Sequence, residues 1–327
     1  MSVALDWIRL AGGGILLFLG AEWFVAGASA LALAIRVPHI IVGLTVVAYG
    51  TSAPEVIVGI EAALADHGEV ALGNVIGSNI ANIGLILGLT ALIKPVAVDG
   101  SLRRREIPVL LISTLLVPGL LLDGAVAHWE GAGLLALAFL YTAWMIRSAR
   151  RSAGRLPRRS DEALLAPIAH FAGGERPAGL LPVGIKASIG LAILLVGGSW
   201  FVAGAVAVAR GLGMSERIVG LTIVAIGTSL PELVTSLVAA RRGHSDLALG
   251  NVLGSNIFNV LLCLGSAALV GQVGASLALV TFDLAALVFM TALVVLFTRR
   301  ARTISRLEGG VALLAYVILM IITVVRG

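Results

Sequence analysis

The sequence predicts an all-α membrane protein with ten transmembrane helices, arranged as two inverted-topology repeats of five helices each. Three observations support this prediction: the composition, the number of long apolar windows and a duplicated motif. Of the 327 residues, 59% are hydrophobic and 13% are charged, and the mean hydropathy is +1.05. Soluble domains carry about 25% charged residues. The composition therefore indicates a multispanning membrane protein, with the lipid bilayer as its surroundings.

Ten windows of the chain are long and apolar enough to cross a bilayer as helices. A helix needs about 20 residues to span about 30 Å of hydrocarbon. The first helix starts near Asp6 without a basic segment or a cleavage site, so we expect it to be retained rather than removed as a signal peptide. The expected spans are residues 10–35, 39–64, 70–93, 106–123, 128–147, 183–209, 216–240, 246–270, 275–298 and 307–325.

The basic residues predict the orientation of these spans. With the N-terminus outside, 19 of the 23 Lys and Arg residues fall in inside segments, and the positive-inside rule favours this arrangement. We therefore expect a protein of the cell (inner or plasma) membrane with both termini outside. The basic segment RRSAGRLPRRS at residues 150–160 has no interleaved aromatic residues, which argues against a nucleic-acid partner.

A long internal repeat divides the chain. The hexapeptides GTSAPE at 50–55 and GTSLPE at 227–232 are 177 positions apart, and the same offset aligns GNVIGSNIANI with GNVLGSNIFNV. Residues 42–83 and 219–260 share 24 identities in 42 positions without a gap. Each unit has an odd number of helices, so the second copy enters the membrane in the opposite orientation, an architecture typical of transporters. We expect a first repeat at 1–147, a basic cytoplasmic linker at 148–182 and a second repeat at 183–327.

The hexapeptide places a helix break inside the membrane. Pro54 has no N–H to donate to the carbonyl of Gly50, and its ring crowds that turn, so the helix is expected to open there. We expect the carbonyls around Ala48 to Gly50 to become free acceptors, which lipid does not tolerate unless they face protein, water or an ion. Just past the break, the spacing of Thr51, Ser52 and Glu55 puts their oxygens on one side of the helix.

The second motif adds a polar stripe. Asn74, Ser78 and Asn82 recur every four residues. The second half supplies the matching set: Thr228, Ser229, Glu232, Asn251, Ser255 and Asn259. Oxygen ligands without thiolate or imidazole suit Ca²⁺ or Na⁺, whereas Mg²⁺ gives up its waters reluctantly. A buried acid costs about 2.5–3.5 kcal/mol on insertion scales and two glutamates repel, so a bound cation is the natural partner.

These paired motifs, GTS-x-PE and GN-V-x-GSNI-x-N, resemble the alpha repeats of the sodium/calcium exchanger family, of prokaryotic type, within the calcium:cation antiporter superfamily. The resemblance implies that Glu55 and Glu232 ligate Ca²⁺ and share in Na⁺ binding. It also implies alternating access, in which the first and sixth helices slide across the core. The other ligands that it implies are Thr51, Ser52, Ser78, Thr228, Ser229 and Ser255, with the carbonyls of Ala48 and Ala225.

Asn82 and Asn259 complete the candidate metal site, and Asn259 departs from the pattern. Several family members carry an aspartate at the position of Asn259, so this chain has two carboxylates in the proposed centre. The number of Na⁺ ions exchanged per Ca²⁺ is therefore left open. The linker of about 35 residues is too short for a folded calcium-sensing domain.

The function predicted is a secondary antiporter that exchanges Na⁺ for Ca²⁺, with no cofactor and no implied protein partner. An antiporter coupled to H⁺ or K⁺ on the same scaffold is an alternative, and a cation channel is a third possibility that fits the broken helices less well. The chain shows no nucleophile, metal triad or nucleotide loop, so an enzyme is not expected.

Several other residues receive simpler interpretations. Glu22 has no acidic repeat mate, and a role in an ion pathway and one in bundle hydrogen bonding both remain open. We expect exposed or solvated positions for Glu61, Asp283, His67 and His244. We expect packing roles for Cys263, Asn79, Asn256, Gly73, Gly77, Gly250 and Gly254.

Overall fold

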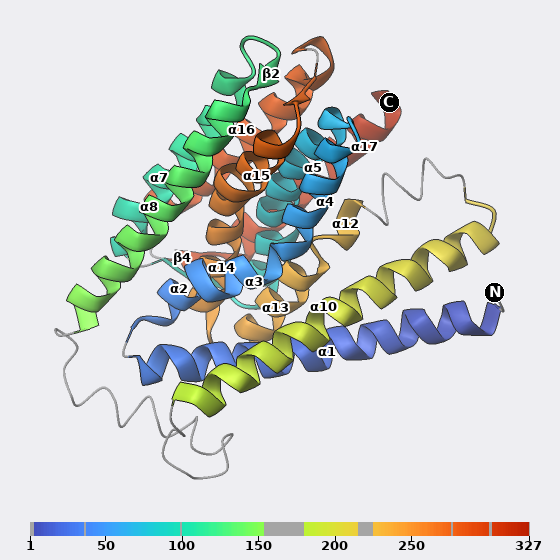
Figure 1. Ribbon diagram of the computed structural model, residues 1–327. Coiled ribbons are helices and arrows are strands. Elements are labelled where there is room, and N and C mark those ends of the chain that lie inside the picture. The colour runs from blue at the N-terminus through green and yellow to red at the C-terminus, as the bar shows by residue number, and fades with distance from the viewer. Residues whose placement is uncertain are drawn as a thin grey trace.

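The computed structural model describes residues 3–35, 37–98, 100–153, 180–214, 225–275, 277–300 and 303–326, and these residues are almost entirely helical. Two long helices, α1 and α10, cross one side of a bundle formed by the other long helices (Figure 1). The first half contains α1 (Val3–Ala34), α2 (His39–Val42), η1 (Gly43–Val47), α3 (Ala48–Thr51), α4 (Ala53–Leu64), α5 (Gly68–Ala81), η2 (Asn82–Leu87), α6 (Gly88–Ile93), α7 (Gly100–Leu120) and α8 (His128–Ala153).

The described part of the second half follows the same order. It contains α10 (Leu180–Gly211), α12 (Ala225–Gly227), α13 (Leu230–Arg241), α14 (Ser245–Phe258), η4 (Asn259–Leu264), α15 (Gly265–Val270), α16 (Leu277–Arg300) and α17 (Arg306–Arg326). The segments η1, η2 and η4 are short stretches of π-helix within longer helices.

Within the described residues, seven helices are long and apolar enough to cross a membrane, or eight if a bent pair counts as one span. The bent pair is His39–Thr51 with Ala53–Leu64. The two other expected spans are not among these helices, for different reasons. The charged residues 103–106 lie inside every 18-residue window of α7, and the span expected at 216–240 begins with residues 216–224, which lie outside the described ranges.

Three helix ends extend beyond the expected windows. The first helix begins at Val3 rather than at residue 10, because a helix can continue past the hydrocarbon into water. Similarly, α8 continues to Ala153, into the segment expected to be linker, and α10 begins at Leu180. The rest of the predicted linker, residues 154–179, lies outside the described residues.

A seam of glycines joins α1 to α10. A Cβ at Gly20 would lie 2.3 Å from the backbone N of Leu194, and one at Gly197 would lie 2.5 Å from the backbone N of Leu17. The backbones thus touch, as small residues allow in membrane helices. The remaining glycines of the seam also face backbone or Cβ atoms of the opposite helix: Gly13 and Gly27 on α1, and Gly190 and Gly204 on α10.

The contacts of this seam are reciprocal under the 177-residue offset. Gly13 faces Phe201, and its repeat mate Gly190 faces Phe24, the repeat mate of Phe201. The other four glycines obey the same rule. Two short antiparallel ribbons also connect the halves. In one, β1 (Val96–Ala97) pairs with β4 (Thr303–Ile304), and in the other, β2 (Ala125–Val126) pairs with β3 (Val273–Gly274). Each ribbon thus takes one strand from each half.

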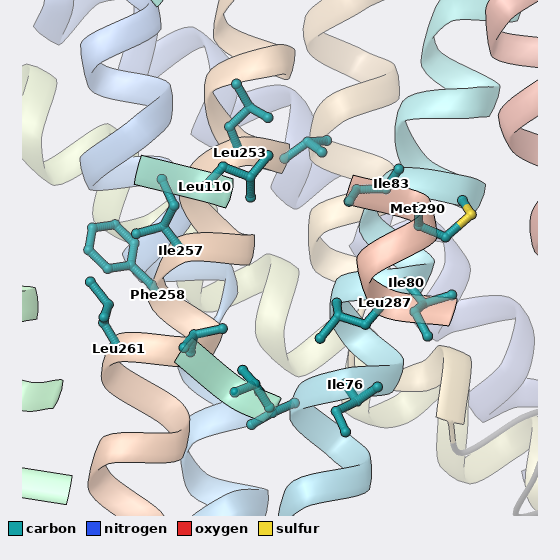
Figure 2. Packing of buried hydrophobic residues seen from close by; sticks show 14 of the residues in the cluster. Ile76, Ile80, Ile83, Leu110, Leu253, Ile257, Phe258, Leu261, Leu287 and Met290 are labelled. Atoms are coloured by element: carbon teal, nitrogen blue, oxygen red, sulfur yellow. The ribbon is translucent and has the colours of Figure 1, made fainter. Parts of the chain in front are cut away.

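The hydrophobic core surrounds α5 and α14, which are the most buried of the apolar helices. Figure 2 shows Ile76, Ile80 and Ile83 on α5 and η2, across from Leu253 and Ile257 on α14 and near Leu287 and Met290 on α16. A separate, smaller cluster packs α1 and α10 against the bundle. Both long helices therefore rest on the bundle through an apolar interface of their own.

Candidate cation site

Both hexapeptides break their helices, as the sequence predicts. In the first half α3 ends at Thr51, Ser52 adopts φ −82° and ψ 5°, and α4 starts with Pro54 in its first turn. The two helices of this pair are bent by 43°. In the second half Ser229 adopts φ −88° and ψ 7° in front of α13, whose first turn holds Pro231. Proline is tolerated in the first turn of a helix because no N–H is needed there.

One detail of the predicted break is wrong. The carbonyl of Ala48 is not a free acceptor, because it accepts the N–H of Ser52 at 3.0 Å. The helical hydrogen bonds continue through Ser52, and the chain turns only after it. The Ala48 oxygen therefore keeps one lone pair rather than two for any other partner. Ala225, its repeat mate, is the first residue of α12.

The two glutamates lie together in the core of the molecule. Glu55 on α4 and Glu232 on α13 are each only 1% exposed. The Ser52 hydroxyl donates to Oε1 of Glu232 at 2.9 Å, and the Ser229 hydroxyl donates to Oε1 of Glu55 at 3.3 Å. Each carboxyl group is thus held by a serine from the other half of the chain.

The second oxygen of each carboxyl group has no hydrogen-bond partner among the described residues. These are Oε2 of Glu55 and Oε2 of Glu232, and both atoms are buried. The two carboxyl groups lie close enough to interact electrostatically. A buried carboxylate oxygen without a partner costs free energy, and a second carboxylate nearby adds repulsion. A cation between the two groups would relieve both penalties.

The predicted hydroxyl ligands line the same buried region. Ser255 is fully buried and Ser78 is almost so. The hydroxyls of Ser255 and Thr228 are buried without hydrogen-bond partners among the described residues. The Thr51 hydroxyl differs, because it lies 3.0 Å from the carbonyl oxygen of Val47 and 3.2 Å from Oδ1 of Asn251. Both partners are acceptors, so these contacts use only the hydroxyl hydrogen, and the lone pairs of the Thr51 oxygen are left for a cation.

Four asparagines form two reciprocal amide pairs across the halves. Asn82 donates from Nδ2 to Oδ1 of Asn256 at 3.0 Å, and Asn259 donates from Nδ2 to Oδ1 of Asn79 at 3.1 Å. Asn79 and Asn256 thus make the inter-helix hydrogen bonds expected of packing residues. The stripe residues Asn82 and Asn259 also open the π-helices η2 and η4. Single π-helical turns occur frequently at functional sites, and the sequence spacing gave no sign of them.

The two remaining asparagines of the stripes donate hydrogen bonds to the backbone of the glutamates. Asn74 donates to the carbonyl oxygen of Glu55 at 3.1 Å, and Asn251 donates to that of Glu232 at 3.4 Å. Asn251 also donates to the Ser236 hydroxyl at 3.0 Å. Sequence reasoning missed Ser236 because its repeat mate is Gly59, so the duplication drew no attention to it.

Among the residues outside the site, His244 lies in a turn as expected but is half-buried rather than exposed. Its ring stacks on that of His39 with centroids 4.8 Å apart, and its Nε2 lies 3.3 Å from the Ser29 hydroxyl. His39 Nε2 lies 2.9 Å from the same hydroxyl. These contacts join residues that are distant in sequence, which a local pattern cannot reveal. By contrast, His67 is exposed as expected.

The other acidic residues agree with the expectations only in part. Glu61 is exposed, as expected, whereas Asp283 is half-buried within α16 rather than at a wetted helix end. Glu22 forms an ion pair with Arg242, which follows α13. This pair links α1 to the bundle, so Glu22 has a bundle contact.

The packing residues behave largely as expected. Cys263 is fully buried, and its thiol lies 3.4 Å from Oδ1 of Asn259. A Cβ at Gly250 would lie 2.5 Å from the carbonyl oxygen of Ile40, and one at Gly254 would lie 2.8 Å from the Cβ of Ala48, so both glycines allow close packing. The expectation is wrong for Gly73 and Gly77, where a Cβ would meet no described atom within 4 Å and close packing does not require glycine.

Comparison with known proteins identifies the family. A family model for the sodium/calcium exchanger protein matches residues 5–147 and 187–325. The chain is 30% identical over 345 aligned positions to the sodium/calcium exchanger MaX1 of Methanosarcina acetivorans, covering 98% of this chain and 99% of that one. It is 38% identical over 258 residues to the inner membrane protein YrbG of Escherichia coli, covering 79% and 78%.

A solved structure agrees over nearly the whole chain. The sodium-calcium exchanger NCX_Mj, soaked with 2.5 mM Na⁺ and 10 mM Sr²⁺, is similar with a TM-score of 0.83 at 34% identity, covering 97% of this chain and 98% of that chain. Together with the family match, this likeness establishes that the chain is an integral membrane protein and belongs to the sodium/calcium exchanger family of antiporters.

Proposed function

We propose that this protein exchanges Na⁺ for Ca²⁺ across the cell membrane by alternating access. The observation that supports this most directly is the pair of buried glutamates, Glu55 and Glu232, each with one carboxyl oxygen left without a partner among the described residues. Two carboxylates can balance the charge of one Ca²⁺. In its absence, Na⁺ ions bound among the same oxygens can supply the compensating charge.

The proposed site takes its ligands from both halves. Ca²⁺ binds six to eight oxygens, and here the carboxyl groups would be joined by hydroxyl, amide and backbone oxygens. The proposed ligands are the side chains of Glu55, Glu232, Thr51, Ser52, Ser78, Asn82, Thr228, Ser229, Ser255 and Asn259, with the carbonyls of Ala48 and Ala225. The reciprocal bonds from Ser52 and Ser229 to the glutamates support a site that lies between the halves.

The proposed architecture is ten transmembrane helices in two inverted repeats, residues 1–147 and 183–327, with a cytoplasmic linker at 148–182 and both termini outside. Reciprocal contacts support it. The hydroxyls of Thr114 and Thr291, which are repeat mates, lie 3.1 Å from each other in the core. A residue that contacts its own repeat mate lies on the pseudo-two-fold axis that relates two such repeats.

Alternating access requires one part of the molecule to move against another. The glycine seam holds α1 and α10 together, and an apolar cluster of its own seats them on the bundle. We propose that the two helices slide as one body across the bundle and expose the site to each side in turn. A packed apolar interface permits such shear, whereas a channel would need a continuous pore.

The test is ⁴⁵Ca²⁺ uptake into proteoliposomes loaded with Na⁺, with K⁺, or with neither ion under an imposed proton gradient. Uptake that requires Na⁺ inside is expected. Uptake driven by K⁺ or by protons alone would assign the coupling to that ion instead. Current that persists when the opposing ion is removed would indicate a channel and overturn the proposal.

A matched control comes from an exposed acid on the same helix as Glu55. Glu61→Gln removes a charge from α4 outside the buried network, so uptake should stay near that of the unaltered protein. Glu55→Gln should reduce uptake to the level of empty vesicles.

A further inference from the structure

The two amide pairs raise the question of what Asn79 and Asn256 do beside the proposed ligands Asn82 and Asn259. All four side chains are 1% exposed. They contact each other across the halves, each off-stripe asparagine accepting from a stripe asparagine. None of the cation chemistry described above uses Asn79 or Asn256.

An asparagine amide has a donor end and an acceptor end of nearly the same shape. Only the oxygen end can ligate a cation, whereas the NH₂ end repels it. A half-turn about the last side-chain bond exchanges the two ends, so an asparagine ligand needs something to hold its nitrogen away from the ion. In metal sites that task falls to hydrogen-bond partners behind the ligands.

We propose that Asn79 and Asn256 are positioning residues that orient the amides of Asn259 and Asn82 so that their oxygens face the cation. This inference rests on the proposed function. Oδ1 of Asn256 takes the Nδ2 hydrogen of Asn82 at 3.0 Å, and Oδ1 of Asn82 is then left buried without a partner among the described residues. The orphaned oxygen is the atom that a cation would use.

The second pair has the same polarity. Oδ1 of Asn79 takes the Nδ2 hydrogen of Asn259 at 3.1 Å, which directs the Asn259 oxygen away from Asn79, and this oxygen accepts a hydrogen bond from the Cys263 thiol at 3.4 Å. Both stripe asparagines therefore point nitrogen at their partner and oxygen away from it. The segments that carry them also pack against the helices that carry the glutamates, η2 against α13 and η4 against α4.

Removal of the acceptor should free the amide to turn. In Asn256→Leu, a side chain of similar size cannot accept a hydrogen bond from Asn82. The NH₂ group of Asn82 is then free to turn and donate to other buried oxygens, where it competes with the cation for them. Loss of such outer partners weakens metal affinity by about 10- to 100-fold. We expect a loss of that size in Ca²⁺ affinity, measured by calorimetry on the purified full-length protein in detergent.

A double variant separates orientation from packing. In Asn82→Asp both side-chain oxygens can ligate, so no partner is needed to choose between them. Asn256→Leu should therefore lower Ca²⁺ affinity about tenfold or more in the unaltered chain but by less than about twofold in the Asn82→Asp background. A packing defect would lower it equally in both backgrounds, and that result would overturn the inference.

Asn256→Asp and Thr298→Val complete the set. Asn256→Asp keeps the acceptor, so it should bind Ca²⁺ at least as tightly as the unaltered protein, and a tenfold loss would contradict the inference even if Asn256→Leu fails to fold. Thr298→Val removes a buried hydroxyl whose hydrogen bonds among the described residues go to the carbonyl oxygens of Val294 and Val295, within α16, and it should leave affinity unchanged.

The outcomes also distinguish the two proposals. If the unaltered protein binds Ca²⁺ but shows no exchange in vesicles, the proposed function fails while the positioning role is still decided by the binding data. If the unaltered protein binds neither Ca²⁺ nor Na⁺, both proposals fail. If it binds Ca²⁺ and exchanges it, and Asn256→Leu binds Ca²⁺ equally well, only the positioning role fails.

Discussion

The Ser52 hydroxyl donates a hydrogen bond of 2.9 Å to Oε1 of Glu232, across 180 positions of sequence. Its repeat mate, Ser229, donates to Glu55 in return. Each glutamate follows a break in its own half, yet the other half orients it. Neither half alone therefore holds a complete arrangement of carboxyl and hydroxyl groups.

The glutamates give the first prediction. Glu55→Ala and Glu232→Ala should each abolish Ca²⁺ exchange, because either change removes one of the two charges that would balance the ion. Uptake of ⁴⁵Ca²⁺ by vesicles with equal amounts of inserted protein measures the effect. Near-normal flux in either variant would contradict the proposed site.

Asn259→Asp adds a titratable group to the site and gives the second prediction. The third carboxylate should change the number of Na⁺ ions moved per Ca²⁺, or make transport depend on pH over the range in which that carboxylate titrates. Parallel ²²Na⁺ and ⁴⁵Ca²⁺ fluxes between pH 5 and pH 8 measure both. An unaltered ratio and an unaltered pH profile would place residue 259 outside the ion shell.

The glycine seam gives the third prediction. Gly20→Ala puts a Cβ 2.3 Å from the backbone N of Leu194, so α1 and α10 must separate. Overpacking of this kind costs about 1–3 kcal/mol, and thermal unfolding in detergent should show a lower midpoint. Gly12→Ala is the matched control on the same helix, because its Cβ would meet nothing closer than a Trp200 ring atom at 4.0 Å. Equal midpoints for the two variants would show that the seam tolerates separation.

The fourth prediction concerns acid. Burial lowers the pKa of His244 below its usual 6.5. Just below pH 6.5 the ring is therefore neutral in the folded protein, whereas it is protonated in the unfolded chain. Stability should then be complete above about pH 6.5 and decline as the pH falls below that value, since the unfolded state binds more protons. The groups that act on the ring are His39, Asp246, Arg242 and Lys94.

Thermal unfolding between pH 8 and pH 5 tests this expectation. His244→Gln keeps a polar group near Ser29 but removes the titration, so its unfolding midpoint should fall less between pH 7 and pH 5 than that of the unaltered protein. Parallel pH profiles for the two proteins would mean that His244 does not contribute.

The sequence predicted those features of the molecule that repeat or that lie on one helix. The broken helices follow from Pro54 and Pro231, and the burial of Glu55 and Glu232 follows from the apolar stretches around them. The glycine seam was within reach as well, because Gly13, Gly20 and Gly27 recur every seven residues and have repeat mates at the 177-residue offset.

Other features depend on contacts between distant segments. The pairing of Asn82 with Asn256 crosses 174 positions, and the stacking of His39 on His244 joins the start of α2 to a turn in the second half. No local pattern encodes such partners. The π-helical turns at Asn82 and Asn259 were also beyond sequence reasoning, because the residue spacing there fits an α-helix equally well.

The seam between α1 and α10 is self-complementary, like the interface of a symmetric homodimer. Each half carries both sides of the contact, as each subunit does in an isologous dimer. Because one chain joins the halves, their encounter is intramolecular and does not depend on concentration in the membrane. With both halves in one chain, one half can also differ from the other, as at Glu22, whose mate is Ser199, and at Ser236, whose mate is Gly59. A true dimer would have to accept every such substitution twice.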